Sequence, residues 1–342
     1  MRITIKEVAQ RAGVSASTVS LVLNNPDSAI SEKTRERVLE VVRELRYRPN
    51  QLAVSLATKK TNTIGLIVPD NSNFFLIAYS NCLEAAMSEY GYTMILGNAN
   101  NCLEKTLHYL YDFSDRGVDA IILMQSAFTN AEDTKACMDA VKDLQVPIAL
   151  VDRFPENHAD SIRVNDFLGG YLAFKHLLDL GHRRIGIIAG EMYLHNCIER
   201  LDGCKKALAE FGLSFDPTLL YEGTFQISSG INALPYLLGK NVTAIFAFND
   251  MIAYGVYKEL RNYNLSIPDD ISIIGFDDIL FSDVIFPPLT TIEYPLKDIA
   301  ETVVSRLVTL IQGGEVDTLQ PVLFDPVLKV KGSTRRLPNT EA

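Results

Sequence analysis

The 342-residue chain has no tryptophan, and none of its apolar runs reaches the roughly 18 residues that a membrane-spanning helix requires. Its first residues lack the apolar centre of a signal peptide and include an acid at Glu7, so we expect a cytoplasmic protein. The five cysteines are odd in number and lack C-x-x-C spacing, and the five histidines lack ligand spacing. These absences predict reduced thiols, with neither a metal site nor a cofactor.

Motifs of common enzyme families are also absent. The sequence contains no G-x-x-x-x-G-K-[ST] phosphate loop, no G-x-G-x-x-G dinucleotide motif and no G-x-S-x-G nucleophile turn. No candidate nucleophile stands beside a base. We therefore predict no catalytic residues and a chain that is not an enzyme.

The charge of the chain is unevenly distributed. Residues 1–60 carry eleven Lys and Arg against six Asp and Glu, a balance of +5, whereas the remaining residues carry −15, which gives the total of −10. A small basic module on an acidic body can hold a polyanion at one end while the body faces metabolites.

Three helices are predicted in the basic module. The first covers 5–12, Gly13 permits a sharp turn, and the second covers about 17–24 with Val19, Val22 and Leu23 facing inward. Ser31 can cap a third helix, which ends near Tyr47. Its predicted buried stripe consists of Val38, Leu39, Val41, Val42 and Leu45.

Two short helices joined by a tight turn and braced by a third form a helix-turn-helix, whose second helix enters the major groove of DNA. Ala16, Ser17 and Ser20 are predicted to face outward, where small side chains let the helix approach the bases. Leu21 suits contact with a thymine methyl group. Candidates for phosphate contacts include Thr18 and Arg35. A three-helix module that binds protein is the alternative from these residues alone.

The stretch from Asn50 to about 61 is predicted to form a short hinge helix. Asn50 is a good N-cap, but a helix this short is marginal in water and orders only against a partner. Leu56 could wedge between base steps in the minor groove. The alternative is a plain linker with a helical tendency.

Beyond residue 62, short β-branched runs alternate with longer amphipathic stretches, which predicts buried parallel strands between helices. The predicted strands are 64–68, 93–96, 120–124, 148–151, 185–189, 244–248, 271–276 and 290–292. Polar residues follow several of them, where open α/β sheets bind ligands. Asp250 either contacts a ligand or caps the helix after it. The stretch 182–184 is predicted to be a solvated turn before a strand.

Several stretches form a recognisable pattern. In the basic module they include Thr4-Ile5-Lys6-Glu7-Val8-Ala9, Ser17-Thr18-Val19-Ser20-Leu21-Val22-Leu23-Asn24 and Tyr47-Arg48-Pro49-Asn50. In the body they include Gly181-His182-Arg183-Arg184-Ile185, Glu199-Arg200-Leu201-Asp202-Gly203 and Pro288-Leu289-Thr290-Thr291-Ile292. These stretches resemble the lactose repressor / galactose repressor family, and the resemblance covers nearly the whole chain.

The resemblance implies an α/β protein with an all-α helix-turn-helix headpiece and hinge helix, followed by two doubly wound parallel-sheet subdomains of periplasmic-binding-protein type. The headpiece would span 1–49 and the hinge 50–61. The effector-binding and dimerisation core would span 62–338, and 339–342 would be a tail. Within the core, one subdomain would comprise 62–163 and 294–324, and the other 164–293 and 325–338.

The resemblance also implies site residues. Those that would contact DNA are Thr4, Ser15, Ala16, Ser17, Thr18, Ser20, Leu21, Asn24, Arg35, Tyr47, Asn50, Ser55 and Leu56. Those that would contact an effector are Asn73, Phe74, Phe75, Asp152, Arg200, Phe225, Asn249 and Asp277. Carboxylates, an amide, an arginine and aromatic rings together suit a sugar with paired hydroxyls and apolar ring faces.

We therefore expect a homodimeric repressor that binds a pseudo-palindromic DNA operator and responds to a small effector, with a carbohydrate favoured. A protein corepressor could also supply the signal. The alternatives are a sugar-binding protein of periplasmic-binding type without specific DNA recognition, and an α/β enzyme with an N-terminal adaptor.

Overall fold

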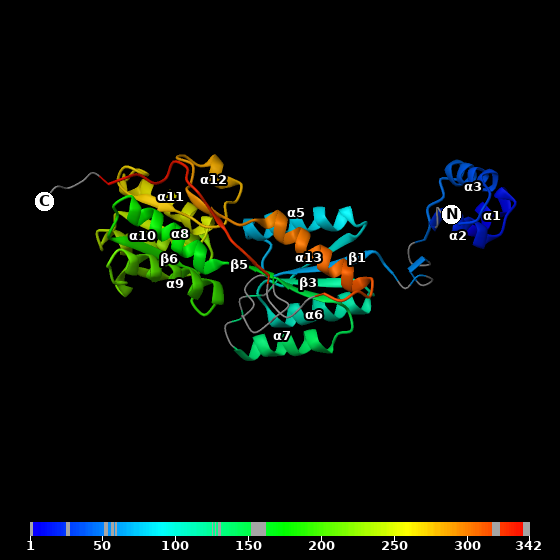
Figure 1. Ribbon diagram of the computed structural model, residues 1–342, viewed down its shortest axis with the longest axis horizontal. Helices are drawn as coiled ribbons and strands as arrows, with labels where there is room; N and C mark the ends of the chain where they lie inside the picture. The colour runs from blue at the N-terminus through cyan, green and yellow to red at the C-terminus, as the bar shows by residue number, and fades with distance from the viewer. Residues whose placement is uncertain are drawn as a thin grey trace. The chain divides into compact units, whose positions relative to one another are not determined.

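The computed structural model describes residues 3–24, 28–50, 54–55, 58, 60–124, 126, 128, 131–151, 162–316 and 322–337 (Figure 1). The chain divides into two compact units with the boundary between Thr61 and Asn62. We call the first unit the headpiece and the second the core. Across the described ranges, we find no helix with the length and apolarity needed to span a membrane.

The headpiece is built from α1 (Ile5–Ala12), α2 (Ala16–Asn24) and α3 (Glu32–Glu44). A capping box between Thr4 and Glu7 starts α1, and Gly13, in the left-handed region at φ 64°, ends it. Val8, Val19 and Val38 are fully buried and hold the three helices together. The predicted helix-turn-helix is confirmed.

The first subdomain of the core is centred on a parallel sheet with strand order β11-β5-β4-β3-β1-β2. The strands are β1 (Thr63–Val68), β2 (Thr93–Asn98), β3 (Ala120–Met124), β4 (Ile148–Val151), β5 (Ile162–Val164) and β11 (Val322–Phe324). Helices α5 (Phe74–Glu89) and α13 (Leu296–Ile311) cover one face, and α6 (Leu103–Asp115) and α7 (Ala131–Asp143) the other (Figure 1). Alternate residues of β3 therefore enter two different cores, with Ile122 in one and Ile121 in the other.

The second subdomain has a four-stranded parallel sheet with order β7-β6-β8-β9. The strands are β6 (Ile185–Ala189), β7 (Leu220–Glu222), β8 (Ala244–Ala247) and β9 (Ser272–Ile274). The helices around it pack as two pairs. One pair is α8 (Asp166–Asp179) with α9 (His195–Glu210), and the other is α10 (Ile227–Leu238) with α11 (Asp250–Leu260). Two short 3₁₀ turns cover Pro217–Leu219 and Arg261–Tyr263.

The remaining elements join the subdomains or lie at the surface. Strands β10 (Thr291–Glu293) and β12 (Val327–Lys329) form an antiparallel ribbon. The sequence predicts the run 290–292 among the parallel strands. Because β10 pairs with β12 in the antiparallel direction, that prediction is wrong for the main pairing of this run. Helix α12 (Phe281–Val284) is a single turn with large apolar neighbours exposed to solvent.

Three local expectations need correction. Leu39, predicted to be buried in the stripe of α3, is 37% exposed because it lies beside the face that Val38 and Val41 bury. Ala16, predicted to face outward, is half-buried and packs against the headpiece core. His182, predicted in a solvated turn, is buried and its ring bonds to Thr243 and to the carbonyl of Arg335.

Candidate DNA-binding surface and effector pocket

The exposed face of α2 carries small and polar side chains. Ser15 caps the helix by accepting a hydrogen bond from the N–H of Thr18 at 3.0 Å. Ser17 and Leu21 are exposed, Leu21 to 46%, while Ser20 is half-buried. The helix carries no charged residue, so an approaching phosphate backbone must be attracted by cations on the flanking elements. Asn24 is the last residue of α2.

Arg35 braces the headpiece from within. Its guanidinium donates to the carbonyl of Val22 at 3.3 Å and to the hydroxyl of Ser28 at 3.0 Å. These bonds tie α3 to the last turn of α2 and to the loop that follows it. The predicted phosphate contact of Arg35 stays a prediction, because a guanidinium has five N–H donors. Tyr47 is also partly buried against the headpiece core, whereas Thr4 is exposed at the start of α1.

Part of the predicted hinge is described. Val54, Ser55 and Thr58 are helical. The N–H of Val54 donates to the carbonyl of Asn50 at 3.0 Å, and the hydroxyl of Thr58 donates to the carbonyl of Val54 at 2.9 Å. Leu56, the predicted wedge, lies outside the described residues.

In the core, one pocket brings together six of the predicted effector residues. It is lined from the first subdomain by Asn73 and Phe75, which start α5. From the second subdomain it is lined by Asn196, Arg200, Phe225, Asn249 and Asp277, and Tyr294 lies beyond β10. Phe225, Asn249 and Asp277 follow the carboxyl ends of β7, β8 and β9, where parallel sheets bind ligands.

Arg200 is the central cation of this pocket and is 2% exposed. Its Nε donates to Oδ1 of Asp166 at 2.7 Å, and Nη2 donates to the hydroxyl of Tyr294 at 2.9 Å. Nη1 donates to the carbonyl of Phe248, and the guanidinium lies 3.6 Å from the ring centroid of Phe276. Burial, the largest single effect, would lower the pKa of Arg200, but the electrostatic interactions with Asp166, Tyr294 and Asp277 together outweigh it, so the pKa lies above its ordinary value.

The amide side chains of the pocket are fixed by the backbone. Asn249 caps α11, with Oδ1 accepting from the N–H of Ile252 at 2.8 Å, and its Nδ2 donates to the carbonyl of Phe225 at 3.3 Å. Asn73 caps α5 in the same way. Asp277 is 6% exposed and has a φ of 114°, a conformation that L residues rarely adopt. The polar lining is therefore preorganised by local structure.

The pocket is closed in this structure, with a volume of about 10 Å³, which is room for about one water molecule. The rings of Phe75 and Tyr294 meet edge to face with centroids 5.0 Å apart, and Phe74 meets Phe281 at 5.1 Å. A sugar-sized ligand therefore requires the lining residues to move apart.

Not every predicted effector residue lines this pocket. Phe74 is 39% exposed and packs outside it, and Asp152 lies outside the described residues. Sequence reasoning considered Asp166 and Tyr294 without assigning them to the site, and it missed Asn196. The strand before Asp166 has only three residues and gave no signal of its own, whereas Asn196 stands four residues before Arg200 on the same helical face.

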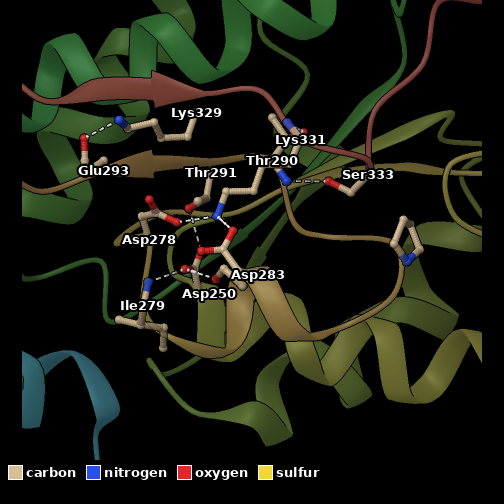
Figure 2. Close-up of polar contacts among 12 residues, drawn as sticks. Asp250, Asp278, Ile279, Asp283, Thr290, Thr291, Glu293, Lys329, Lys331 and Ser333 are labelled. Carbon is tan, nitrogen blue, oxygen red and sulfur yellow. Dashed lines mark hydrogen bonds and ion pairs between the residues drawn. The ribbon is translucent and has the colours of Figure 1, made fainter.

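Asp250, which follows the pocket residue Asn249 in the chain, is fully buried and bonds to neighbouring elements (Figure 2). Its carboxylate accepts from the N–H of Ile279 at 3.0 Å and from the hydroxyls of Ser282 at 2.5 Å and Thr291 at 2.6 Å. It therefore joins α11 to α12 and β10, while Asn249 supplies the cap and lines the pocket. Burial raises the pKa of Asp250 to about 7.

Beside this carboxylate, Lys331 lies between two further acids (Figure 2). Its Nζ is 2.6 Å from Asp278, which precedes α12, and 2.6 Å from Asp283, which belongs to α12. Asp250 and Asp278 each follow a residue that lines the pocket, Asn249 and Asp277. The segments 249–250 and 277–278 therefore each contribute one residue to the pocket wall and the next residue to the contacts around α12.

Comparison with known proteins agrees with both halves of this architecture. Residues 4–50 match the family model described as bacterial regulatory proteins, lacI family, and residues 174–334 match a periplasmic binding protein-like domain. The HTH-type transcriptional repressor PurR of Vibrio cholerae is 36% identical over 91% of this chain and 92% of its own length.

Two solved structures extend the comparison to the full architecture. The lac repressor dimer bound to operator and the anti-inducer ONPF is 28% identical, covers 98% of this chain and 100% of that one, and gives a TM-score of 0.85. A LacI-family transcriptional regulator from Enterococcus faecium with bound ribose is 31% identical, covers 81% of this chain and 100% of that one, and gives a TM-score of 0.72.

Proposed function

Because this chain belongs to the lacI family of bacterial regulatory proteins, we propose that it is a repressor whose operator affinity is set by a carbohydrate bound in the pocket around Arg200. The family consists of DNA-binding transcriptional regulators rather than enzymes. The chain accordingly combines a DNA-binding headpiece with an effector-binding core.

One observation supports the pocket as the effector site above all others. Its walls come from both subdomains, with Asn73 and Phe75 on one side and Arg200, Asn249 and Asp277 on the other. A ligand held by both sides must bind differently to their open and closed arrangements. Such differential binding is what allows a ligand to shift a conformational equilibrium.

The chemistry of the lining favours a polyol over an anion. Arg200 is already neutralised by Asp166, and Asp277 adds a further carboxylate, so the pocket offers acceptors to hydroxyl groups rather than excess positive charge. Phe75, Phe225 and Tyr294 supply apolar faces for a ring. The ribose in the Enterococcus faecium regulator supports the same class of ligand.

We propose that the repressor is a homodimer in which each headpiece binds one half of a pseudo-palindromic operator. The lac repressor structure, a dimer on operator, supports this arrangement. On the core, Leu280, Val284 and Phe286 are 77%, 69% and 90% exposed around α12, and such a patch suits a second copy of the chain. Pairing would also hold the two hinge segments together, with Leu56 wedged in the minor groove.

The alternative is a sugar-binding protein without specific DNA recognition. That alternative assigns no function to the capped α2 and its small exposed side chains. We therefore place the protein in the cytoplasm, on DNA. The test is to select duplexes from a random pool with the purified full chain and to measure their binding by fluorescence anisotropy.

We expect the selected duplexes to share a near-palindromic motif and to bind one dimer. Recovery of unrelated sequences with equal affinity, at several salt concentrations, would contradict the proposal. A thermal-shift screen of sugars, with sugar phosphates and nucleosides as the comparison classes, then identifies the effector.

A further inference from the structure

A second cavity of about 180 Å³ lies in the second subdomain, apart from the effector pocket. Its apolar lining includes Phe174 of α8, Ile187 of β6, Leu208 of α9, and Phe215 in the segment that leads to β7. The polar part of its lining comes from Arg183, Arg184, Ser214 and Asp216. Its rim reaches Ile185, the first residue of β6, whereas the effector residues follow the opposite, carboxyl ends of the strands. We call it the α8–α9 cavity.

The size of the cavity selects a class of ligand. An apolar cavity of roughly 150 Å³ in another protein accepts benzene, so about 180 Å³ accommodates a single ring with one small substituent. Hydroxyl groups buried against the apolar part of the lining would lose their hydrogen bonds to water without gaining new ones, which is unfavourable. The mixed lining therefore suits an amphipathic ligand, with an apolar body against the apolar residues and a polar group against the others.

The rim of the cavity carries positive charge. Arg183 and Arg184 are both exposed there, and Asp216 is the acid among the lining residues, which leaves a balance of +1. Asp216 is engaged by the N–H and hydroxyl of Thr218 at 2.9 and 2.8 Å, and these bonds lower its pKa and keep it ionised. A ligand that carries one negative charge would balance the rim.

The two arginines are positioned by the backbone. Nη1 of Arg183 donates to the carbonyls of Leu178 and His182 at 2.8 and 2.9 Å, and Nε of Arg184 donates to the carbonyl of Lys240 at 2.9 Å. These carbonyls position the guanidinium groups through hydrogen bonds, and Arg184 also interacts electrostatically with Asp216. Because a guanidinium has five N–H donors, each arginine keeps donors for a carboxylate.

We propose that the α8–α9 cavity binds a small amphipathic monoanion, with one aromatic ring or a branched chain of similar size and one carboxylate at the rim. The ring would lie against Phe174, Leu208 and Phe215, and the carboxylate would meet Arg184. This binding does not depend on the identity of the effector, because the residues of the two sites do not overlap.

The cavity and the effector pocket nevertheless share one rigid pair of helices. A Cβ on Gly170 of α8 would lie 2.1 Å from the carbonyl oxygen of Arg200, and one on Gly203 of α9 would lie 2.1 Å from that of Phe167. The helices therefore touch backbone to backbone and move together. Asp166 and Arg200 lie near one end of the pair, and Leu208 lines the cavity near the other end of α9.

The experiment uses the full chain and three probes in ligand-observed NMR titrations. Benzoate has the ring and the charge, benzyl alcohol has the ring alone, and acetate has the charge alone. We expect saturable binding of benzoate, about tenfold tighter than that of either comparison compound. Equal binding of benzoate and benzyl alcohol, or no binding of benzoate, would overturn the proposal.

Variants locate the site. Arg184→Met should weaken benzoate about tenfold and leave benzyl alcohol unchanged, whereas Arg261→Met, at an arginine outside the cavity, should change neither. Leu213→Trp should fill the cavity and abolish binding of both rings. Ser214→Trp, at an exposed lining position, repeats the test if the first variant does not fold. Unchanged benzoate binding in a folded Trp variant would place the ligand elsewhere and refute the assignment.

Discussion

Arg200 and Asp166 form a buried ion pair, with Nε and Oδ1 2.7 Å apart and side chains that are 3% and 7% exposed. The pair links α9 to the first residue of α8 at the wall of the effector pocket. The hydroxyl of Tyr294 completes the arrangement by donating to the same carboxylate oxygen at 3.1 Å. Removing one partner would leave a charge buried without compensation.

This relationship predicts a large loss of stability on removing the carboxylate. Asp166→Ala should lower the free energy of unfolding by about 3–5 kcal/mol, measured by urea denaturation. The matched control is Lys205→Ala, which removes an exposed ion pair to Asp202 on the same helix. That change should cost about 0–1 kcal/mol. Equal losses in the two variants would show that the buried pair does not stabilise the core.

Local sequence signals predicted the headpiece and most of the sheets but not this triad. The caps at Thr4 and Ser31 and the β-branched runs are visible within a few residues of sequence, because the contacts that they make are local. Asp166, Arg200 and Tyr294 are 34 to 128 residues apart, and their convergence depends on how α8, α9 and β10 pack.

The burial of a single side chain was harder to predict from the sequence than whether a segment forms a helix or a strand. Leu39 belongs to the apolar pattern of α3, yet the three-helix headpiece is too small to cover that side of the helix. From the sequence, Arg35 is a candidate phosphate contact because surface arginines of DNA-binding modules often contact phosphate. Only the structure shows the carbonyl of Val22 and the hydroxyl of Ser28 that hold it.

Asp250 predicts a pH dependence of stability between pH 5 and 8. Because its pKa rises from 3.8 to about 7 on folding, its neutral form stabilises the fold at low pH, and this contribution is lost as the pH rises through 7. The free energy of unfolding of the wild type, relative to Asp250→Asn, should therefore fall by about 2–3 kcal/mol from pH 5 to pH 8.

The comparison with Asp250→Asn is needed because two histidines act in the opposite direction. Burial lowers the pKa values of His176 and His182, so their contribution to stability grows as the pH rises. Both remain in the variant and cancel in the difference, which chemical denaturation at each pH measures. A difference that is constant from pH 5 to 8 would show that Asp250 does not titrate in this range.

Arg35→Met tests whether that arginine braces the headpiece or contacts phosphate. The loss of its hydrogen bonds to Val22 and Ser28 should destabilise the headpiece by about 1–3 kcal/mol, measured by its thermal unfolding. The salt dependence of DNA binding should stay as steep as in the wild type. Arg37→Met, at an exposed position of the same helix, should leave stability unchanged. A shallower salt dependence of DNA binding, without loss of stability, would show that Arg35 contacts phosphate.

Leu21→Ala tests the reading face of α2. Because Leu21 is exposed, the substitution should leave the headpiece as stable as the wild type. It should weaken binding to the selected operator by about 1 kcal/mol through loss of apolar contact, and leave binding to random duplexes unchanged. Fluorescence anisotropy on both duplexes measures the two affinities, with Leu39→Ala on α3 as the exposed apolar control. An equal effect on both duplexes would remove Leu21 from sequence recognition.

The central claim is that the pocket around Arg200 and the DNA-binding headpiece are thermodynamically coupled. The most direct measurement is the affinity of the full chain for its effector, determined by calorimetry with and without saturating operator duplex. The account predicts that operator changes the effector affinity by about tenfold or more, and that effector changes operator affinity by the same factor. An effector that binds equally tightly to the free protein and to the operator complex would contradict it.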